Sequence, residues 1–110
     1  MMRLYISGPM TGLPDFNYPA YQHAAIELRR VGYEVLDPSD IDGLHNPTPE
    51  TPQSWDWYMR HALRMVLDAE GVATLPGWTR SRGAALEVHI ACALNLPVES
   101  VEFWQRGGAL

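Results

Sequence analysis

Glu87 is the residue whose type and position most favour chemistry in this chain. It lies in residues 82–94, a segment that is apolar nearly all round and follows the helical period. Because helical side chains lean toward the helix N-terminus, Glu87 reaches over Gly83 and Ala84, whose small side chains leave space for a ligand. The structural alternative is that Glu87 pairs with a loop arginine, and that Gly83 only lets the helix pack close to a sheet.

The start of the same helix favours an anionic or hydroxyl-rich group. Ser81 is a candidate N-cap, and Arg80 and Arg82 flank it. The first turn of a helix also offers free backbone N–H groups and the positive end of the macrodipole. Trp78, in the loop before this helix, is a candidate to stack on a base.

A glycine-containing turn at residues 7–12 leaves the first strand-like run and lets backbone approach a ligand closely. It has neither the G-x-G-x-x-G order of a dinucleotide site nor the G-K-[ST] ending of a P-loop, so NAD and nucleoside triphosphates are not indicated. The four histidines show no metal-ligand spacing, and no G-x-S-x-G elbow occurs. We therefore expect no metal and no cofactor. Cys92, in the apolar helix, is expected to be a buried, reduced thiol.

Strand-like and helical segments alternate along the chain and position these residues. Strands are expected at residues 3–7, 33–36, 71–75 and 98–103, and helices at 17–32, 54–67 and 82–94, the first capped by Asn17 and the second by Ser54. This order predicts a three-layer α/β/α sandwich, Rossmann-like or flavodoxin-like, with a parallel sheet of four to five strands. Ligands of such folds collect at the carboxyl ends of the strands. The loop at residues 37–52 is expected to cross the surface near the pocket.

Composition limits the classes of protein that need be considered. The chain has 110 residues, 46% of them hydrophobic, which suits a single domain over residues 1–110. Its net charge of -5 argues against nucleic acid as a partner. A single cysteine cannot form an internal disulfide, and no segment looks like an export signal or a membrane span. We therefore expect a cytoplasmic protein without membrane association.

Several segments together resemble a known superfamily. They are the run Tyr5-Ile6-Ser7-Gly8-Pro9-Met10-Thr11-Gly12, the run Gly32-Tyr33-Glu34-Val35-Leu36, and Leu75-Pro76-Gly77-Trp78 followed by Ser81-Arg82-Gly83-Ala84 and Glu87. The combination resembles the nucleoside 2-deoxyribosyltransferase-like superfamily, in particular its small bacterial and phage branch, the DUF4406 domain. The resemblance covers almost the whole chain.

The resemblance implies roles for individual residues. In the characterised deoxyribosyltransferases and deoxynucleoside 5'-monophosphate glycosidases, a helix glutamate attacks the anomeric carbon, and Glu87 matches it. An ionised carboxylate with an ordinary pKa suits a retaining mechanism through a covalent glycosyl-enzyme. Ser81 and Gly83 match phosphate-binding residues, and Gly8 and Gly12 match glycines of the first loop.

The chain departs from the enzymes' pattern at several positions. Ala62 stands where they place a helix aspartate, Thr11 replaces a first-loop arginine, and Glu70 replaces the aspartate that opens the third strand. Glu70 or Asp15 is a candidate acid in place of the missing aspartate.

Three functions follow as alternatives. The first is an N-glycosidase or deoxyribosyltransferase that acts on a nucleoside or nucleoside 5'-monophosphate, with Glu87 as nucleophile and with Tyr5, Gly8 and Trp78 lining the pocket. The second is a binding or sensing module that keeps the pocket without the chemistry, which the loss at Ala62 favours. The third is a scaffold without a small ligand. The resemblance also implies a homo-oligomer, a dimer or larger.

Overall fold

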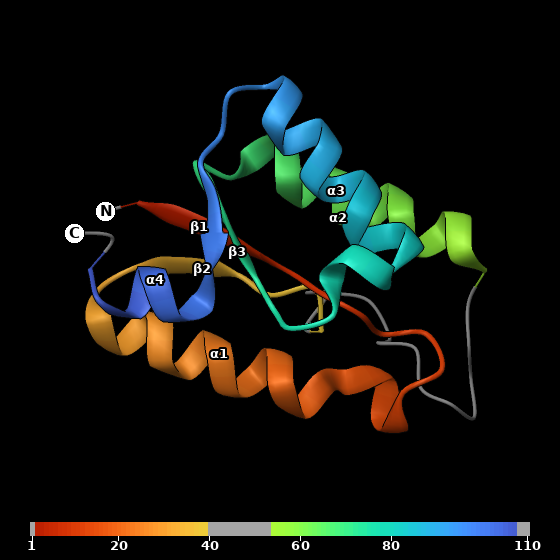
Figure 1. The fold of residues 1–110 in the computed structure, drawn as a ribbon, viewed down its shortest axis with the longest axis horizontal. Coiled ribbons are helices and arrows are strands. Elements are labelled where there is room, and N and C mark those ends of the chain that lie inside the picture. Colours follow the sequence, from red (N-terminus) through yellow and green to blue (C-terminus); the bar gives the residue numbers. More distant parts are fainter. Residues whose placement is uncertain (1, 40–53, 108–110) are drawn as a thin grey trace.

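The computed structural model describes residues 2–39 and 54–107 and has a parallel sheet at its centre. Its strands are β1 (Arg3–Ser7), β2 (Glu34–Leu36), β3 (Gly71–Thr74) and β4 (Val98–Ser100). They form a four-stranded sheet in the order β2-β1-β3-β4, and every neighbouring pair is parallel. The carboxyl ends of all the strands therefore lie along one edge of the sheet (Figure 1).

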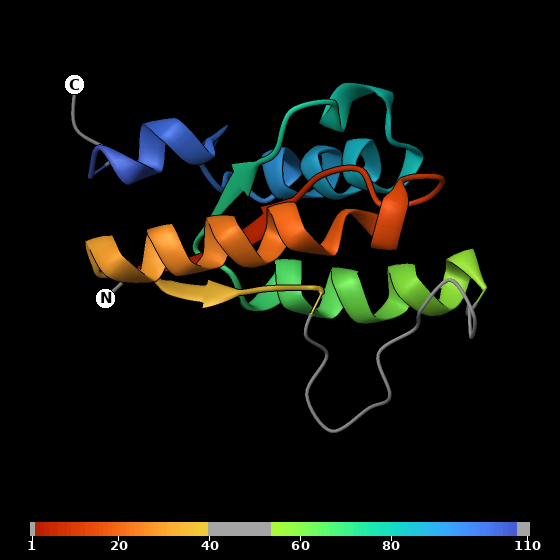
Figure 2. The same ribbon diagram turned by 90° about the horizontal axis from the view of Figure 1, so that it is seen from below.

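Helices cover both faces of this sheet. The longer ones are α1 (Tyr18–Val31), α2 (Trp55–Asp68) and α3 (Arg82–Ala93), and α4 (Val101–Gln105) follows β4; short 3-10 turns occupy Pro14–Asn17 and Trp78–Arg80. Helices α1 and α4 lie on one face, and α2 and α3 lie on the other (Figures 1 and 2). The predicted α/β fold with a parallel sheet between helices is confirmed.

The two central strands, β1 and β3, are buried on both faces, and successive side chains of β1 enter different cores. Leu4 and Ile6 pack with α1 and α4, whereas Tyr5 packs with the α2 and α3 side. This alternation follows from the period of two along a strand. It directs the odd-numbered residues of β1, Tyr5 and Ser7, toward the helix that carries Glu87.

Serine side chains begin two of the helices as predicted, but Asn17 acts differently. The Ser54 hydroxyl accepts a hydrogen bond from the Trp57 N–H, and the Ser81 hydroxyl accepts one from the Ala84 N–H. Asn17 has a left-handed backbone and makes no side-chain cap; its amide instead donates to the Pro9 carbonyl at 3.0 Å. That bond ties the start of α1 to the loop after β1.

The C-terminal segment was predicted as one strand over residues 98–103, and this is wrong after Ser100. The Ser100 hydroxyl accepts from the Phe103 N–H at 3.2 Å and begins α4. Trp104, which is buried, donates its indole N–H to the Val72 carbonyl at 2.9 Å. The aromatic and β-branched residues here favour a strand locally, but burial of Trp104 against the sheet stabilises the helical turn.

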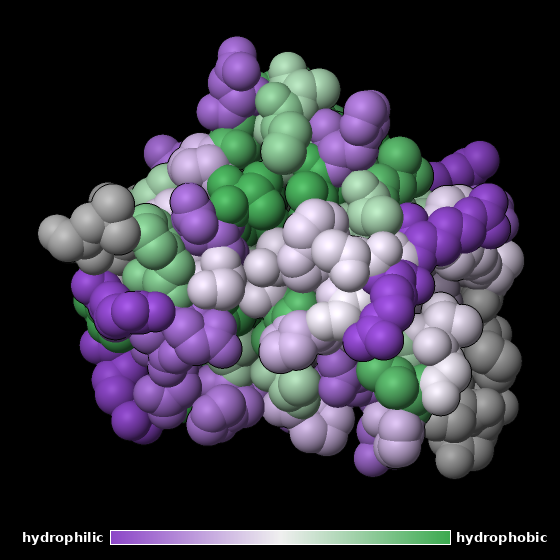
Figure 3. Space-filling view, viewed as in Figure 1, coloured by the Kyte–Doolittle hydropathy of each residue, from purple (hydrophilic) through white to green (hydrophobic). Residues whose placement is uncertain are grey.

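One further expectation, the burial of the third helix, needs correction, and another concerns a loop that lies mostly outside the described residues. Helix α3 is buried on only part of its surface: Cys92 is exposed, not buried, and Leu94 is 48% exposed. Apolar residues accordingly gather at the surface over this helix (Figure 3). The predicted loop at 37–52 lies mostly outside the described residues. Only its first part, residues 37–39, is described. Within the described parts of the chain, no helix has both the length and the apolar character needed to cross a bilayer.

Candidate functional site

A small cavity lies at the carboxyl end of β1, between α2 and the first turns of α3. Its volume is about 80 Å³. Strand β1 and the loop after it, residue 38 after β2, one face of α2, and α3 all contribute to its wall. The lining residues are Tyr5, Gly8, Met10, Thr11, Phe16, Tyr21, Pro38, Trp55, Tyr58, Met59, Ala62, Met65, Ser81, Gly83, Ala84 and Glu87.

The carboxylate of Glu87 is held at this cavity by hydroxyl groups of β1. Glu87 is only 6% exposed, and the Ser7 hydroxyl donates to its Oε1 at 2.6 Å. The Tyr5 hydroxyl also donates to this carboxylate. Both donors come from alternate residues of one strand, so the sheet fixes the orientation of the acid. Among the described residues no arginine pairs with Glu87, and such a pair was the structural alternative to a site.

Burial changes the protonation of this acid. Desolvation raises the pKa of Glu87 from 4.5 to about 7, although the hydrogen bonds from Ser7 and Tyr5 act in the opposite direction. The expectation of an ordinary pKa is therefore wrong, and both protonation states are populated near neutral pH. Burial, followed by the charge of Glu87, also raises the pKa of Tyr5 well above its usual range, so Tyr5 remains a donor.

A wider groove adjoins the cavity. It has a volume of about 610 Å³ and shares Met10, Thr11, Trp55, Ser81 and Gly83 with the cavity wall. The cavity alone is smaller than a site for a drug-sized ligand, which is typically about 300–1,000 Å³. Cavity and groove together offer room for a ligand with one end beside Glu87 and the other in the open groove.

The groove carries the cationic side chains near α3. Arg80 and Arg82 line it, together with the first turn of α3. The Arg82 guanidinium lies 3.8 Å from the centroid of the Trp55 ring. This cation–π contact holds Arg82 beside Trp55, which lines both the cavity and the groove. Ser81 serves as N-cap, so its hydroxyl already accepts the Ala84 N–H at 3.2 Å.

Glycine residues of the site also have packing roles. A Cβ at Gly83 would stand 3.2 Å from the Met59 Sδ, so Gly83 lets α3 approach α2. A Cβ at Gly8 would stand 2.6 Å from the Leu75 Cβ, which no side chain could tolerate. Both glycines line the cavity, but their lack of a side chain is already explained by these neighbours. Gly12 has φ +83 and lines neither the cavity nor the groove.

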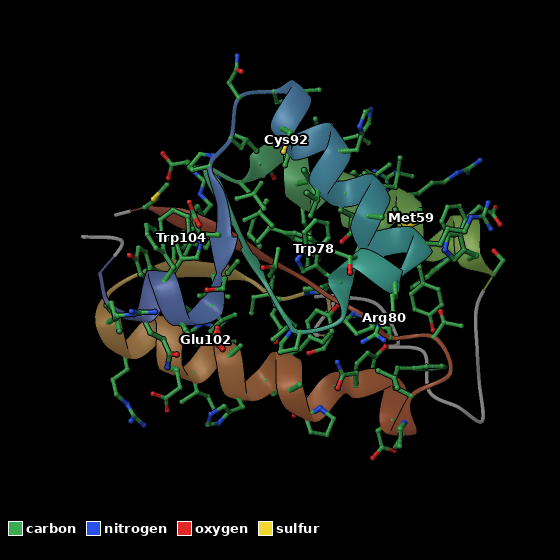
Figure 4. The ribbon with its side chains drawn as sticks, viewed as in Figure 1. Met59, Trp78, Arg80, Cys92, Glu102 and Trp104 are labelled. Carbon is green, nitrogen blue, oxygen red and sulfur yellow. The ribbon has the colours of Figure 1, made fainter. Side chains whose placement is uncertain are left out.

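Besides Gly12, three of the predicted site residues lie elsewhere. Trp78 lines a separate hollow, which Glu102 of α4 also lines; both residues are labelled in Figure 4. Glu70 precedes β3, so it lies at the amino edge of the sheet, where its Oε1 accepts the Arg3 N–H at 2.8 Å. Asp15 is exposed and does not line the cavity. Neither candidate acid therefore meets Glu87.

Aromatic residues that sequence reasoning passed over form another part of the wall. Phe16 meets the Tyr58 ring edge-on, with 6.1 Å between centroids. Phe16 has φ 53, and the residues on either side of it are also left-handed. Non-glycine residues rarely adopt this conformation, and such strain concentrates at functional sites. Tyr21, whose hydroxyl donates to the Gly8 carbonyl at 2.6 Å, supports the loop beneath.

Apart from Trp55 and Tyr58, the residues that α2 contributes to the cavity wall are apolar. Met59, Ala62 and Met65 lie on successive turns of α2 and all line the cavity. None of the α2 residues that line the cavity is acidic. In the part of the chain that the structure describes, no three His, Cys, Asp or Glu side chains gather closely enough to hold a metal ion.

Comparisons with known proteins identify the family and a similar fold. A search of curated proteins found no match. One solved structure, described as "Crystal structure of conserved protein from Enterococcus faecalis V583", is similar with a TM-score of 0.64 and 22% sequence identity over 89% of this chain. This chain covers 61% of that one, and at such identity the likeness concerns the fold. The family model described as "Domain of unknown function (DUF4406)" matches residues 2–100, and the chain therefore belongs to this family.

Proposed function

We propose that this protein binds a nucleoside or nucleoside 5'-monophosphate and cleaves or transfers its N-glycosidic bond, with Glu87 as the nucleophile. The single observation that carries the proposal is the buried Glu87 carboxylate, which lines a cavity and is oriented by Ser7 and Tyr5. The resemblance to the nucleoside 2-deoxyribosyltransferase-like superfamily gives this carboxylate its role. The nucleoside ligand and that wider kinship are both part of the proposal.

The proposed reaction is a retaining glycosyl transfer. A Glu87 carboxylate oxygen forms a bond to the anomeric carbon, and the bond to the base nitrogen breaks with its electron pair leaving on the base. Water, or the hydroxyl or ring nitrogen of an acceptor, then attacks the same carbon and releases Glu87. The proton that the attacking group gives up neutralises the departed base.

The protonation of Glu87 sets when this reaction can start. Only the ionised form is a nucleophile, and with a pKa of about 7 the ionised fraction grows through neutral pH. The Ser7 and Tyr5 hydrogen bonds favour the ionised form. We therefore expect the rate to rise with pH on the acid side of neutrality.

The groove suits the polar end of the proposed ligand. Arg80, Arg82 and the first turn of α3 give it positive charge, whereas the chain as a whole carries a net charge of -5. A 5'-phosphate there would leave the sugar near Ser81 and Gly83, which line both spaces, and the anomeric carbon near Glu87. This arrangement favours a nucleotide as the ligand.

A binding or sensing module is the second candidate, and Ala62 favours it. No acid from α2 reaches the cavity, and neither Glu70 nor Asp15 substitutes for it. Without a group to protonate the base, a poor leaving group would remain attached. Such a protein would bind the same ligand and release it unchanged.

One assay distinguishes these candidates. A panel of nucleosides, deoxynucleosides and their 5'-monophosphates is incubated with the protein, and chromatography measures free base. We expect release from at least one member, and its loss in Glu87→Gln. Glu99→Gln, an exposed glutamate outside the cavity, is the matched control. Binding without release would favour the sensing module. The absence of both binding and release would overturn both candidates.

A homo-oligomeric state and a cytoplasmic location complete the proposal. Leu67 and Leu94 are apolar side chains 66% and 48% exposed, which suits burial against another copy. Light scattering of the purified protein tests the first expectation, since a monomer at all concentrations would contradict it.

A further inference from the structure

We propose that the α2 wall selects the ligand by apolar contact, so that this site favours a nucleoside or nucleotide whose base carries an alkyl group over the same molecule without it. The inference rests on the proposed function and adds a ligand class and the residues that select it. Met59, Ala62 and Met65 are those residues.

The position of the wall relative to Glu87 assigns it to the base. Ala62, Met65 and Glu87 line the cavity but not the groove, whereas Ser81 and Gly83 line both. A ligand with its anomeric carbon at Glu87 and its polar 5' end in the groove therefore has its base left for the rest of the cavity. The cavity has a volume of about 80 Å³, so it accepts the part of the planar base that lies deepest in the site and not the whole ligand.

Met59, Ala62 and Met65 offer the base no strong hydrogen-bonding group. Alanine has none, and the methionine thioethers are only weak acceptors. Met59 and Ala62 are buried, and Met65 is half-buried beside them. A polar edge of a base placed here would lose its water without gaining a partner, whereas an alkyl group would gain contact with a polarisable surface.

Three tyrosines that line the cavity are engaged within the protein. The Tyr21 hydroxyl donates to the Gly8 carbonyl, and the Tyr5 hydroxyl donates to Glu87. The Tyr58 side chain interacts with Tyr18. What these side chains turn toward a ligand is therefore mainly ring surface.

Aromatic side chains add a stacking surface that does not discriminate between bases. Phe16 and Tyr58 meet edge-to-face at the cavity, and the backbone around Phe16 is held in the left-handed region. Stacking stabilises any base, because every base has a π-face. Discrimination between bases is thus left to the shape and polarity of the α2 wall.

Matched pairs of ligands test the inference. Glu87→Gln protein, in which turnover is blocked, is titrated by calorimetry with thymidine and deoxyuridine 5'-monophosphates, and with N6-methyl and unmodified deoxyadenosine 5'-monophosphates. Burial of one methyl group corresponds to about fourfold tighter binding. We expect the methylated member of at least one pair to bind about fourfold more tightly or better.

Variants of α2 assign the preference to the wall. Met65→Gln keeps the length of the side chain and adds an amide, and Ala62→Ser adds one hydroxyl; each should bring the ratio within a pair close to one. Arg64→Gln, at an exposed position of α2 outside the cavity and the groove, is the control and should keep the ratio. Should one variant fail to fold, the other still reports.

The outcomes separate this inference from the proposed function. Equal binding of both members of every pair, or a preference that survives both wall variants, overturns the inference and leaves the proposed function standing. No binding of any member, together with no release of base by the unmodified protein, overturns both.

Discussion

Two edges of the same sheet each hold a glutamate against β1, and they treat it differently. At the amino edge, Glu70 accepts a hydrogen bond from the backbone of Arg3, and Arg3 also pairs with Glu34 at 2.8 Å. At the carboxyl edge, Glu87 is buried and accepts hydrogen bonds from hydroxyls alone. At the amino edge a solvent-exposed cation pairs with one of the acids, whereas no cation of the described residues pairs with Glu87.

Burial without a nearby cation distinguishes Glu87 from the acids at the amino edge and accounts for its raised pKa. Solvent and a nearby cation stabilise the charged form of a carboxylate, whereas burial without a cation disfavours it. Desolvation without a cation raises the pKa of Glu87 to about 7. Perturbed acids beside cavities are typical of functional sites, which is why the carboxyl edge is the one proposed to react.

The largest expected effect comes from Glu87→Gln in the base-release assay. The amide cannot attack the anomeric carbon, so we expect the rate to fall by at least about 10³-fold. Glutamine retains the size and can still accept from Ser7, so the fold should be kept, as circular dichroism would verify. Unchanged release in this variant would contradict the role of Glu87.

The next effect is on stability as a function of pH. The pKa of Glu87 is about 7 in the folded protein and near 4.5 when it is unfolded, so the folded state binds more protons between these values. The free energy of unfolding should therefore fall as pH rises from 4.5 to about 7, by on the order of 3 kcal/mol from this residue. It should be unaffected by Glu87 below and above that window.

Urea unfolding at a series of pH values measures this dependence. Subtracting the wild-type curve from that of Glu87→Gln removes the contributions of the other acids. The variant should gain relative stability as pH rises through the window. A difference that stays constant with pH would show that burial does not perturb Glu87.

Ser7→Ala should have a smaller effect of the same kind. It removes a hydrogen bond that favours the ionised Glu87, so the pKa of Glu87 should rise further above 7. Loss of a hydrogen bond to a charged group should cost about 1.5–3 kcal/mol where Glu87 is ionised, and less at acid pH. Carbon NMR of the labelled carboxyl reports the pKa directly, and Thr74→Ala is a control on the neighbouring strand. If the pKa of Glu87 does not rise in Ser7→Ala, the Ser7 hydroxyl does not stabilise the ionised carboxylate.

The arrangement of strands and long helices followed from local pattern, whereas the ends of elements depended on distant contacts. Periodicity and serine caps predicted α2 and α3. The α4 helix was missed because its residues favour a strand locally, and only the sheet shows that Trp104 has a place to be buried. Cys92 was expected inside because the helix is apolar all round, but only the neighbouring elements decide which side they cover.

The candidate site was predictable in part for a similar reason. The lean of a helical side chain over small residues predicted that Glu87 would face a hollow, and the structure places it at one. Its pKa was not predictable, since burial is a property of the assembled core. The Phe16 contact with Tyr58 joins segments far apart in the sequence, and no local signal announced it. Glu70 could have been excluded, because a residue before a parallel strand lies at the opposite edge from one that follows it.

Glu70→Gln tests the glutamate at the amino edge, where the smallest effect is expected. Its Oε1 accepts the Arg3 N–H, and glutamine keeps an oxygen that can do the same. The loss of one exposed charge near Arg3 should change the free energy of unfolding by less than about 1 kcal/mol, and less still at high salt. Release of base should be unaffected, because this acid lies at the edge of the sheet away from Glu87. A large loss of activity with unchanged stability would mean that the amino edge takes part in the reaction, and the contrast between the two edges would fail.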